Sequence, residues 1–410
     1  MNTAPQGLRL HIGIFGRRNV GKSSLLNALT QQQVSIVSAV AGTTTDTVEK
    51  ACELQPLGPV LFLDTAGIDD AGELGGLRVQ KARQAIERTE LALLVVEPGG
   101  WQQSEEDLLE EFVAKQIPVI VATNKIDVGS HEDPWQEMLR AKQQRVVLVS
   151  ARTGQGLGEL RQALLDLAPA DFIDSPSIAG DLVGPGELAV LVVPIDKEAP
   201  KGRLILPQVQ TIRDLLDSDA MCMVVKEREL RLALGRLNAL PKLIVTDSQA
   251  FLKVAADAPV AVPLTSFSIL MARFKGDLAR LVEGSMKIEA LRAGDRVLIA
   301  ESCTHHPIGE DIGRVKIPRW LTQYTGVKLE FEHQQGRDFP ADLSGYSLVI
   351  HCGACMGNRR QMLGRMEQCR QAGVPITNYG LTIAYSLGIF ARALEPFPDA
   401  LEQYHKHCGQ

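Results

Sequence analysis

Residues 16 to 24 have types and a spacing that suit the binding of phosphate groups. They read Gly16-Arg-Arg-Asn-Val-Gly21-Lys22-Ser23-Ser24 and match the pattern G-x-x-x-x-G-K-S/T. In this pattern the glycines let backbone N–H groups wrap around the phosphates, the lysine reaches the β- and γ-phosphate oxygens, and the first serine offers a hydroxyl to Mg²⁺. We therefore predict a nucleoside triphosphate site formed by Gly16, Gly21, Lys22, Ser23 and Ser24.

Two later motifs supply the groups that a guanine nucleotide and its Mg²⁺ require. Asp64 can hold Mg²⁺ through water, and Gly67 can approach the γ-phosphate. In Asn124-Lys125-Ile-Asp127, the carboxylate of Asp127 can accept hydrogen bonds from N1 and N2 of guanine, donors that adenine lacks. These motifs predict GTP rather than ATP as the ligand. Ser150-Ala151 completes the set, because backbone amides at such a segment meet the guanine carbonyl.

Thiols and imidazoles are concentrated in two short segments of the last third of the chain. They are Cys303, His305 and His306 in the first segment, and His351, Cys352 and Cys355 in the second. A C-x-x-C pair places two thiolates within reach of one metal, and a third thiolate with an imidazole completes a pocket of soft ligands. We predict a metal centre that holds either zinc or an iron–sulfur cluster. The alternative is that Cys352 and Cys355 form a buried pair or a redox dithiol unrelated to Cys303.

The motifs lie at the ends of apolar runs that are typical of buried strands. These runs are residues 10–15, 60–63, 119–122, 146–149, 297–300 and 348–350, and a helix is expected over residues 24–29. In an open α/β sheet the carboxyl ends of neighbouring parallel strands meet, and sites form there. We therefore expect strands 297–300 and 348–350 to be neighbours that bring the two cysteine segments together.

The middle of the chain alternates apolar strands with amphipathic helices and carries no evident catalytic motif. Strands are expected over residues 188–193, 221–225 and 243–245, and helices over 208–216, 227–240 and 248–256. A turn-rich stretch from 171 to 186 is typical of a linker. We predict an α/β protein with three domains. They are a P-loop GTP-binding domain over 1–172, with a mostly parallel sheet and helices on both faces, a small α/β dimerisation domain over 173–265, and an α/β iron–sulfur or zinc domain over 266–410.

Composition excludes several classes of protein. Of the 410 residues, 45% are hydrophobic and 22% are charged, as in globular rather than disordered chains. No apolar run approaches the ~20 residues of a membrane-spanning helix, and no signal-peptide pattern opens the chain, so we expect a cytoplasmic protein with no membrane partner. The formal net charge of -6 makes nucleic acid an unlikely class of partner.

Seven cysteines in such a chain do not indicate a disulfide framework. Outside the two segments, we expect Cys52, Cys222 and Cys369 to pack in the core and Cys408 to be exposed near the end of the chain.

Residues 8 to 170 resemble the translation-factor class of small GTPases, in particular the TrmE/Era-like GTPases of tRNA modification and ribosome assembly. In that resemblance residues 42–46 are the switch I segment, in which Thr44 would bind Mg²⁺ in the GTP state. Ile68 stands where Ras-type proteins place a water-orienting glutamine, so intrinsic hydrolysis is expected to be slow. Asn19 stands where the resembling GTPases coordinate K⁺, which implies potassium-stimulated hydrolysis. The alternative is that Asn19 only forms a turn.

The whole chain resembles the GTPases that mature the FeFe-hydrogenase, the HydF family. The resemblance rests on the GTPase motifs, the middle α/β region and the pattern C-x-H … H-C-x-x-C. It implies that Cys303, Cys352 and Cys355 bind a 4Fe–4S cluster, with His305 and His351 as the family histidines, and that the protein is a dimeric scaffold. Such a scaffold receives a di-iron precursor from radical S-adenosylmethionine maturases and delivers it to apo-FeFe-hydrogenase.

Three points stay open in the sequence. The fourth iron ligand is one of His305, His306, His351, Glu310 and Asp311, or an open position. Arg359 and Arg360 either stabilise an anionic cluster or are solvated helix residues. The rival function is that of a zinc-containing GTPase acting on RNA in ribosome assembly or tRNA modification, for which a basic face would be expected.

Overall fold

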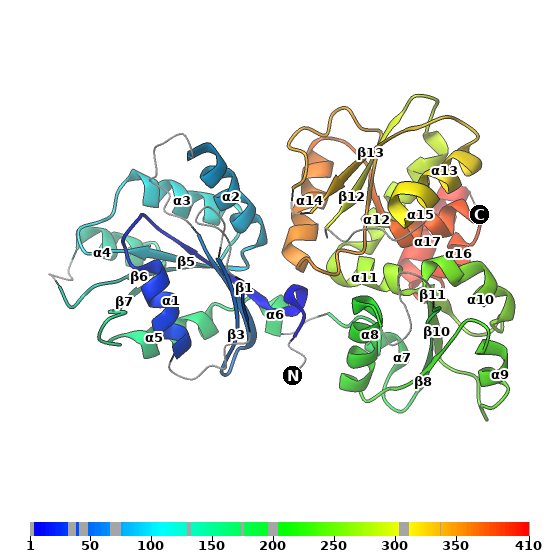
Figure 1. Ribbon diagram of the computed structural model, residues 1–410, viewed down its shortest axis with the longest axis horizontal. Helices are drawn as coiled ribbons and strands as arrows, with labels where there is room; N and C mark the ends of the chain where they lie inside the picture. The colour runs from blue at the N-terminus through cyan, green and yellow to red at the C-terminus, as the bar shows by residue number, and fades with distance from the viewer. Residues whose placement is uncertain are drawn as a thin grey trace. The chain divides into compact units, whose positions relative to one another are not determined.

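The computed structural model describes residues 4–31, 38–40, 48–65, 75–128, 133–173, 176–195, 204–302, 311–336 and 338–409. The chain divides into two compact units, Met1–Ser175 and Pro176–Gln410. One sheet lies in the first unit and two lie in the second (Figure 1). Within the described ranges, no helix combines the length and the apolar character needed to cross a membrane.

The first unit is built on a seven-stranded sheet in the order β2-β3-β4-β1-β5-β6-β7. Its strands are β1 (Leu10–Phe15), β2 (Ser38–Val40), β3 (Val48–Leu54), β4 (Gly58–Asp64), β5 (Leu91–Val96), β6 (Val119–Thr123) and β7 (Arg145–Leu148). All neighbours pair in parallel except β2 with β3 and β3 with β4. The strands predicted from apolar runs are confirmed, and β7 lies one residue earlier than expected.

Helices cover both faces of this sheet. They are α1 (Lys22–Gln31) and α5 (Leu157–Asp166) on one face, and α2 (Gly75–Arg88), α3 (Gln103–Ala114) and α4 (Pro134–Ala141) on the other, with α6 (Ala170–Ile173) and the 3-10 helix Gln6–Leu8 outside them. Side chains that point to opposite faces of β1 belong to separate cores. Ile12 and Ile14 pack with Leu25 and Leu160, whereas Phe15 packs with Phe112. The predicted mostly parallel sheet with helices on both faces is therefore confirmed.

The second unit begins with a four-stranded parallel sheet in the order β11-β10-β8-β9. Its elements are α7 (Gly180–Val183), β8 (Leu188–Val192), α8 (Leu206–Asp217), β9 (Met221–Val225), α9 (Leu230–Leu234), β10 (Leu243–Thr246), the 3-10 helix Ser248–Ala250, α10 (Phe251–Asp257) and β11 (Leu264–Ser266). The predicted boundary between the second and third domains, at residue 265, falls within β11. The division of this unit into two domains stays a prediction.

One helix of the middle region was predicted wrongly. Residues 227–240 form only α9, over Leu230–Leu234, followed by turns. Gly235 lowers helix propensity directly after α9, and Pro241 ends the stretch. Leu232 is 58% exposed, so this segment lacks the buried apolar face that stabilises longer helices.

A second parallel sheet, in the order β13-β12-β14-β15, completes the unit. Its strands are β12 (Arg296–Glu301), β13 (Glu330–Gln335), β14 (Leu348–His351) and β15 (Ile376–Asn378). The helices around it are α11 (Phe267–Lys275), α12 (Leu278–Met286), the 3-10 helix Lys287–Ala290, the π-helix Ile312–Lys316, α13 (Ile317–Thr325), α14 (Arg359–Gln371), α15 (Tyr379–Ser386), α16 (Phe390–Leu394) and α17 (Pro398–Cys408). β12 and β14 are parallel neighbours, with Val297 opposite Leu348 and Ala300 opposite His351. The predicted pairing of the two strands that precede the cysteine segments is confirmed.

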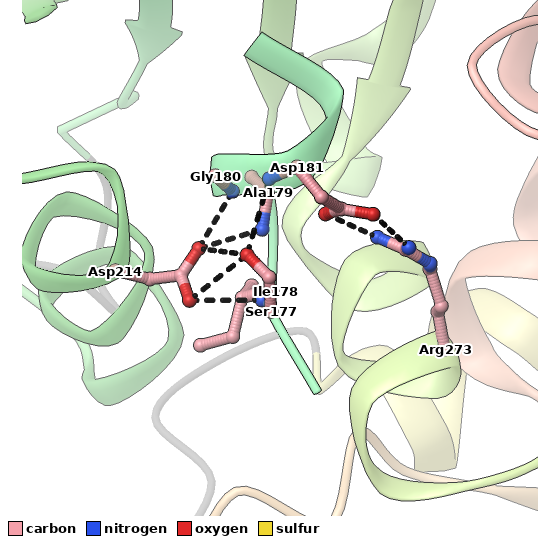
Figure 2. A network of polar contacts seen from close by, with 7 residues as sticks. All are labelled: Ser177, Ile178, Ala179, Gly180, Asp181, Asp214 and Arg273. Carbon is pink, nitrogen blue, oxygen red and sulfur yellow. Dashed lines mark hydrogen bonds and ion pairs between the residues drawn. The ribbon is translucent and has the colours of Figure 1, made fainter. Parts of the chain in front are cut away.

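The stretch expected to be a linker is anchored by one carboxylate of α8 (Figure 2). Asp214 accepts hydrogen bonds from the backbone N–H groups of Ile178, Ala179 and Gly180, at 3.0, 2.8 and 2.8 Å, and from the hydroxyl of Ser177. A carboxylate is well matched to these N–H groups, because they lead into α7 and have no partner within a helix.

The next residue extends the same anchor to another helix. Asp181 in α7 pairs with Arg273 of α11 through both carboxylate oxygens, one of them 2.9 Å from the guanidinium (Figure 2). The start of the second unit is thus fixed to α8 and α11.

The cysteines outside the two predicted metal segments follow the expected burial in three of four cases. Cys52 and Cys369 are fully buried, and Cys408 is exposed. Cys222 was predicted to be in the core but is only half-buried. The reason is that β9 is an edge strand, on which Met221 and Val224 are also exposed.

Candidate functional site

The phosphate-binding loop joins β1 to α1 and depends on two glycines. Gly16 has φ of +139° and Gly21 has φ of +93°, and a Cβ on Gly21 would lie 2.3 Å from Nδ2 of Asn124. The ammonium of Lys22 donates to the carbonyl oxygens of Gly16 and Arg17, both at 2.8 Å, and so lies inside the loop. Asn19 is exposed at the tip of the loop with φ of +63°.

Two of the groups predicted for Mg²⁺, Ser23 and Asp64, lie together at the end of β4. The hydroxyl of Ser23 donates to Oδ2 of Asp64 at 2.6 Å. Burial raises the pKa of Asp64, whereas the Ser23 hydrogen bond and the Lys22 ammonium lower it. Its other oxygen, Oδ1, is buried and has no hydrogen-bond partner within the described ranges. A carboxylate oxygen and a hydroxyl placed in this way are suited to Mg²⁺ and its bound water. Thr44, Gly67 and Ile68 lie outside the described residues.

The guanine-recognition motifs meet at the carboxyl ends of β6 and β7. Asn124 connects the loops, because Nδ2 donates to the Val20 carbonyl at 2.9 Å and Oδ1 accepts from the Ala151 N–H at 3.0 Å. Oδ1 of Asp127 accepts from the Ser150 hydroxyl at 2.5 Å. The structure thus brings together the Asn124, Asp127, Ser150 and Ala151 that the sequence placed in one site.

The Ser150 hydroxyl and the Arg152 guanidinium keep the carboxylate of Asp127 ionised. The Ser150 hydrogen bond lowers the pKa of Asp127 despite some burial, and Arg152, which forms an ion pair with Asp127, lowers it further. Lys125, with φ of +64°, pairs with Glu97 at 2.9 Å. An ionised acceptor at this position suits the N–H donors of guanine.

The second site surrounds the thiols of Cys352 and Cys355. Both are free thiols, and both line a cavity of about 210 Å³ in the second unit. This cavity lies at the carboxyl ends of three strands, because its lining also includes Asp247 after β10 and Glu301 at the end of β12. The location is the one expected for a site in parallel α/β sheets.

The backbone around Cys352 is arranged toward its sulfur. The Ser302 N–H donates to Sγ of Cys352 at 3.2 Å, across the pairing of β12 with β14. Within the C-x-x-C loop, Ala354 is buried with φ of +49°, a conformation that costs energy in any residue with a Cβ. Cys303 follows Ser302 directly in the sequence and lies outside the described residues.

The electrostatic surroundings of the thiols combine burial with two cationic side chains. Burial raises the pKa of Cys355 to about 11, and Lys275 opposes this shift. Burial also raises the pKa of Cys352, opposed by the Ser302 N–H and by Arg365. Metal-free thiols are therefore protonated at neutral pH, and metal binding must release their protons. The buried cations Lys275 and Arg365 favour an anionic thiolate-bound group.

His351 is fully buried, and both of its ring nitrogens make hydrogen bonds. Nε2 is 2.8 Å from the Arg365 guanidinium, and Nδ1 is 2.8 Å from the Cys352 carbonyl oxygen. Burial, together with Arg365, lowers the pKa of His351 to about 3, so the ring is neutral. In this arrangement His351 contacts the cysteine loop through a hydrogen bond to the carbonyl oxygen of Cys352, and both of its ring nitrogens are occupied by hydrogen bonds.

The remaining predicted ligands are distributed as follows. Cys303, His305, His306 and Glu310 lie outside the described residues. Asp311 lines the cavity and accepts from the Arg314 N–H at 2.6 Å, capping the π-helix. Among the ranges that the structure describes, no three His, Cys, Asp or Glu side chains converge as a metal site.

Arg359 makes contacts that the sequence did not predict. Its guanidinium donates to the carbonyl oxygens of Phe274 and Gly276, at 2.8 and 3.0 Å, at the carboxyl end of α11. It is therefore not a solvated residue, and its electrostatic role at a cluster stays a prediction. Unsatisfied carbonyls at a helix end account for this contact.

Sequence reasoning missed Arg365, a buried cation whose charge acts on the Cys352 thiol. α14 carries a buried stripe formed by Met362, Arg365, Met366 and Cys369. An arginine on the apolar stripe of a helix is the signal that could have identified it, because a buried charge requires partners.

Comparisons with known proteins separate the two units. A GTPase family model, described as 50S ribosome-binding GTPase, matches residues 11–125. The tRNA modification GTPase MnmE of Aquifex aeolicus is 35% identical over 174 residues, which are 42% of this chain and 37% of that protein. The GTPase Der of Wolinella succinogenes is 36% identical over 174 residues, 40% of this chain and 36% of that protein. This chain thus matches little more than a third of the length of these relatives.

Among solved structures, the G domain of the Thermotoga maritima iron transporter FeoB is similar to 39% of this chain and 99% of its own length. The sequence identity is 26% and the TM-score is 0.32.

The second unit is matched by two family models. They are the hydrogen maturase F dimerization domain, over residues 178–276, and the hydrogen maturase F tetramerization domain, over residues 279–396. Together with the GTPase domain that precedes them, these matches show that the chain belongs to the hydrogen maturase F family.

Proposed function

We propose that this hydrogenase-maturation GTPase is an iron–sulfur scaffold, which assembles the di-iron precursor of the hydrogenase active-site cluster and transfers it to apo-FeFe-hydrogenase. The observation that carries the proposal is the pairing of β12 with β14. It brings the Ser302 N–H to 3.2 Å from Sγ of Cys352, so the residue that precedes Cys303 in the sequence lies beside the C-x-x-C segment.

The ligand set that we propose is Cys303, Cys352 and Cys355, holding a 4Fe–4S cluster. Three thiolates fit such a cluster and leave one iron with a different or exchangeable ligand. When bound, the cluster supplies an iron that can accept a ligand from outside the protein. His305 and His351 are the family histidines. For His351 to bind iron, it would have to lose its contact with Arg365 or with the Cys352 carbonyl.

The first unit binds GTP and Mg²⁺ and hydrolyses GTP. In our proposal Lys22 neutralises charge on the β- and γ-phosphates, Ser23 and Asp64 hold Mg²⁺ with Thr44, and Gly67 approaches the γ-phosphate. Asn19 coordinates K⁺, which offsets the charge that develops in the transition state and so stimulates hydrolysis. The nucleotide state would bias association with partners rather than drive bond formation at the cluster.

The cysteine spacing and the two matched domains indicate the partners that we propose. Its seven cysteines form no C-x-x-x-C-x-x-C motif, so radical S-adenosylmethionine maturases would have to make the precursor. The two matched domains are named for dimerization and tetramerization and support oligomer formation, and we propose a cytoplasmic homodimer.

The second candidate is a zinc-containing GTPase that acts in tRNA modification or ribosome assembly. It is favoured by the names of the relatives, but these match the GTPase unit alone.

The two candidates are separated by activation of hydrogenase in an anaerobic extract. The extract contains the maturases and apo-hydrogenase but lacks this protein. We expect the wild type to restore hydrogen production and Cys352→Ser to restore none, while both hydrolyse GTP at the same rate. Failure of the wild type to activate, combined with capture of ribosomal or transfer RNA, would support the second candidate instead.

A further inference from the structure

Arg365 is a buried cation that contacts residues at the ends of two neighbouring strands, β12 and β14. It lies on α14 and is 4% exposed. One guanidinium nitrogen, Nη1, is 2.8 Å from Nε2 of His351 and 3.3 Å from the Ser302 hydroxyl. The guanidinium also lies 5.1 Å from the ring centre of Phe339. A single side chain therefore contacts the end of β12 and the end of β14.

The contact with His351 fixes the state of the imidazole. A guanidinium has only donors, so Nε2 of His351 must accept. The ring proton is then on Nδ1, which donates to the carbonyl oxygen of Cys352 at 2.8 Å. This chain of two hydrogen bonds, from Arg365 through His351, orients the peptide that leads from Cys352 into the C-x-x-C loop.

The contact with Ser302 acts at the end of β12. The hydroxyl of Ser302 lies within reach of Arg365, while its backbone N–H donates to Sγ of Cys352 at 3.2 Å. Arg365 therefore contacts both the residue that donates to the Cys352 sulfur and, through His351, the Cys352 carbonyl oxygen.

We propose that Arg365 is a positioning residue for the cluster, which it serves by holding Ser302, at the end of β12, and the peptide that follows Cys352 in fixed positions, and by placing a permanent positive charge beside Cys352. This inference rests on the proposed iron–sulfur function. Partners that orient metal ligands through hydrogen bonds change metal affinity by about 10- to 100-fold when they are removed. A guanidinium is charged at any pH at which the protein is folded, and its planar fork cannot be reproduced by lysine.

The test compares Arg365→Met and Arg365→Lys with wild type after anaerobic reconstitution with iron and sulfide. The matched control is Arg370→Met on the same helix, because Arg370 is exposed and pairs with Glu367 one turn away. The measurements are the rate of iron loss to a chelator, the midpoint potential of the cluster and its electron paramagnetic resonance spectrum. GTP hydrolysis and the thermal unfolding of the metal-free chain are followed in parallel.

We expect Arg365→Met to lose iron at least about 10-fold faster and to show a more negative midpoint potential, with GTP hydrolysis unchanged. Arg365→Lys should recover the potential, because it keeps the charge, but not the retention of iron, because it loses the fork. Arg370→Met should behave as wild type. If Arg365→Met fails to fold, the rate of iron loss from Arg365→Lys alone tests the proposal.

The inference is overturned if wild type holds a cluster and both Arg365 variants retain iron at the wild-type rate and potential. A wild-type chain that takes up no cluster would contradict the proposed function, and this inference with it.

Discussion

We propose that the choice of nucleotide depends on Asp127. Its carboxylate accepts from Ser150 at 2.5 Å and pairs with Arg152, which leaves an ionised acceptor at the edge of the first sheet. In Asp127→Asn an amide donor would face the N2 amino group of guanine, whereas the O2 atom of xanthine would accept from it. We expect the affinity for GTP to fall by roughly 100-fold or more, because two hydrogen bonds to a charged group are lost, and the affinity for xanthosine triphosphate to rise.

The control for this change is Asp166→Asn, on the exposed side of α5. Binding is measured by titration with labelled nucleotides. Unchanged selectivity in Asp127→Asn would contradict the assigned role of this carboxylate.

The pKa of Asp127 predicts how guanine binding depends on pH. The Ser150 hydrogen bond, and then Arg152, hold the pKa of Asp127 below its usual value. A carboxyl group with a lowered pKa stays ionised down to a lower pH than usual. The hydrogen bonds from guanine to Asp127 are therefore lost only below the pH at which an ordinary aspartate is protonated. We expect the loss of affinity caused by protonation of this group to be absent between about pH 8 and pH 5.

A substitution at Asn19 separates the two roles predicted for this residue, that of a potassium ligand and that of a turn former. Its φ of +63° is a conformation that glycine adopts without strain, so Asn19→Gly keeps the shape of the loop and removes only the carboxamide. We expect wild-type hydrolysis to be at least about 10-fold faster in potassium chloride than in sodium chloride, and Asn19→Gly to lose this difference. Equal wild-type rates in the two salts would contradict the potassium site, and stimulation that persists in Asn19→Gly would leave Asn19 as a turn former.

At the scale of elements, the start of the second unit depends on the Asp214 carboxylate of α8. It accepts four donors, three of them backbone N–H groups of residues 178–180 (Figure 2). Asp214→Asn removes the charge and replaces one acceptor with a donor. We expect the free energy of unfolding to fall by about 1–3 kcal/mol, the usual cost of hydrogen bonds to a charged group.

Differential scanning calorimetry measures this change, with Asp217→Asn as control. Asp217 lies on the same helix, but it is exposed and pairs only with Arg213 within the described part of the chain. A melting temperature for Asp214→Asn equal to that of the control would show that the anchor is not stabilising.

Which elements could be predicted follows from how each one is stabilised. Strands β1, β4, β6, β8, β10, β12 and β14 were found from apolar runs, because parallel strands buried on both faces carry such runs. The edge strands β7 and β9 carry similar runs and were found in the same way. Strand β13 reads Glu330-Phe-Glu-His-Gln-Gln335, with one apolar residue, and its sequence carries no signal of that kind. Its pairing to β12 is decided by tertiary contact.

The sites were predictable to the extent that each motif lies within one loop. The glycines and Lys22 of the phosphate loop all lie within residues 16–22, so their spacing alone indicates their chemistry. Arg365 and Lys275 belong to α14 and α11, and only the folded arrangement brings their charges near Cys352 and Cys355. Helical spacing marks Arg365 as buried but does not identify what it contacts.

At the scale of the whole molecule, the chain carries two separate chemistries. The first unit contains a GTPase site, and the second contains a thiol-lined cavity in a pair of domains matched to hydrogen maturase F. The central claim is that this cavity holds an iron–sulfur cluster.

Anaerobic reconstitution of the full chain with iron and sulfide tests that claim most directly, through visible absorption and electron paramagnetic resonance of the reduced protein. We expect a brown protein with about four irons per chain, the content of one 4Fe–4S cluster, and a reduced-cluster signal that Cys303→Ala and Cys352→Ala each abolish while Cys222→Ala preserves it. A colourless chain that carries zinc, or a signal that survives the loss of either cysteine, would contradict it.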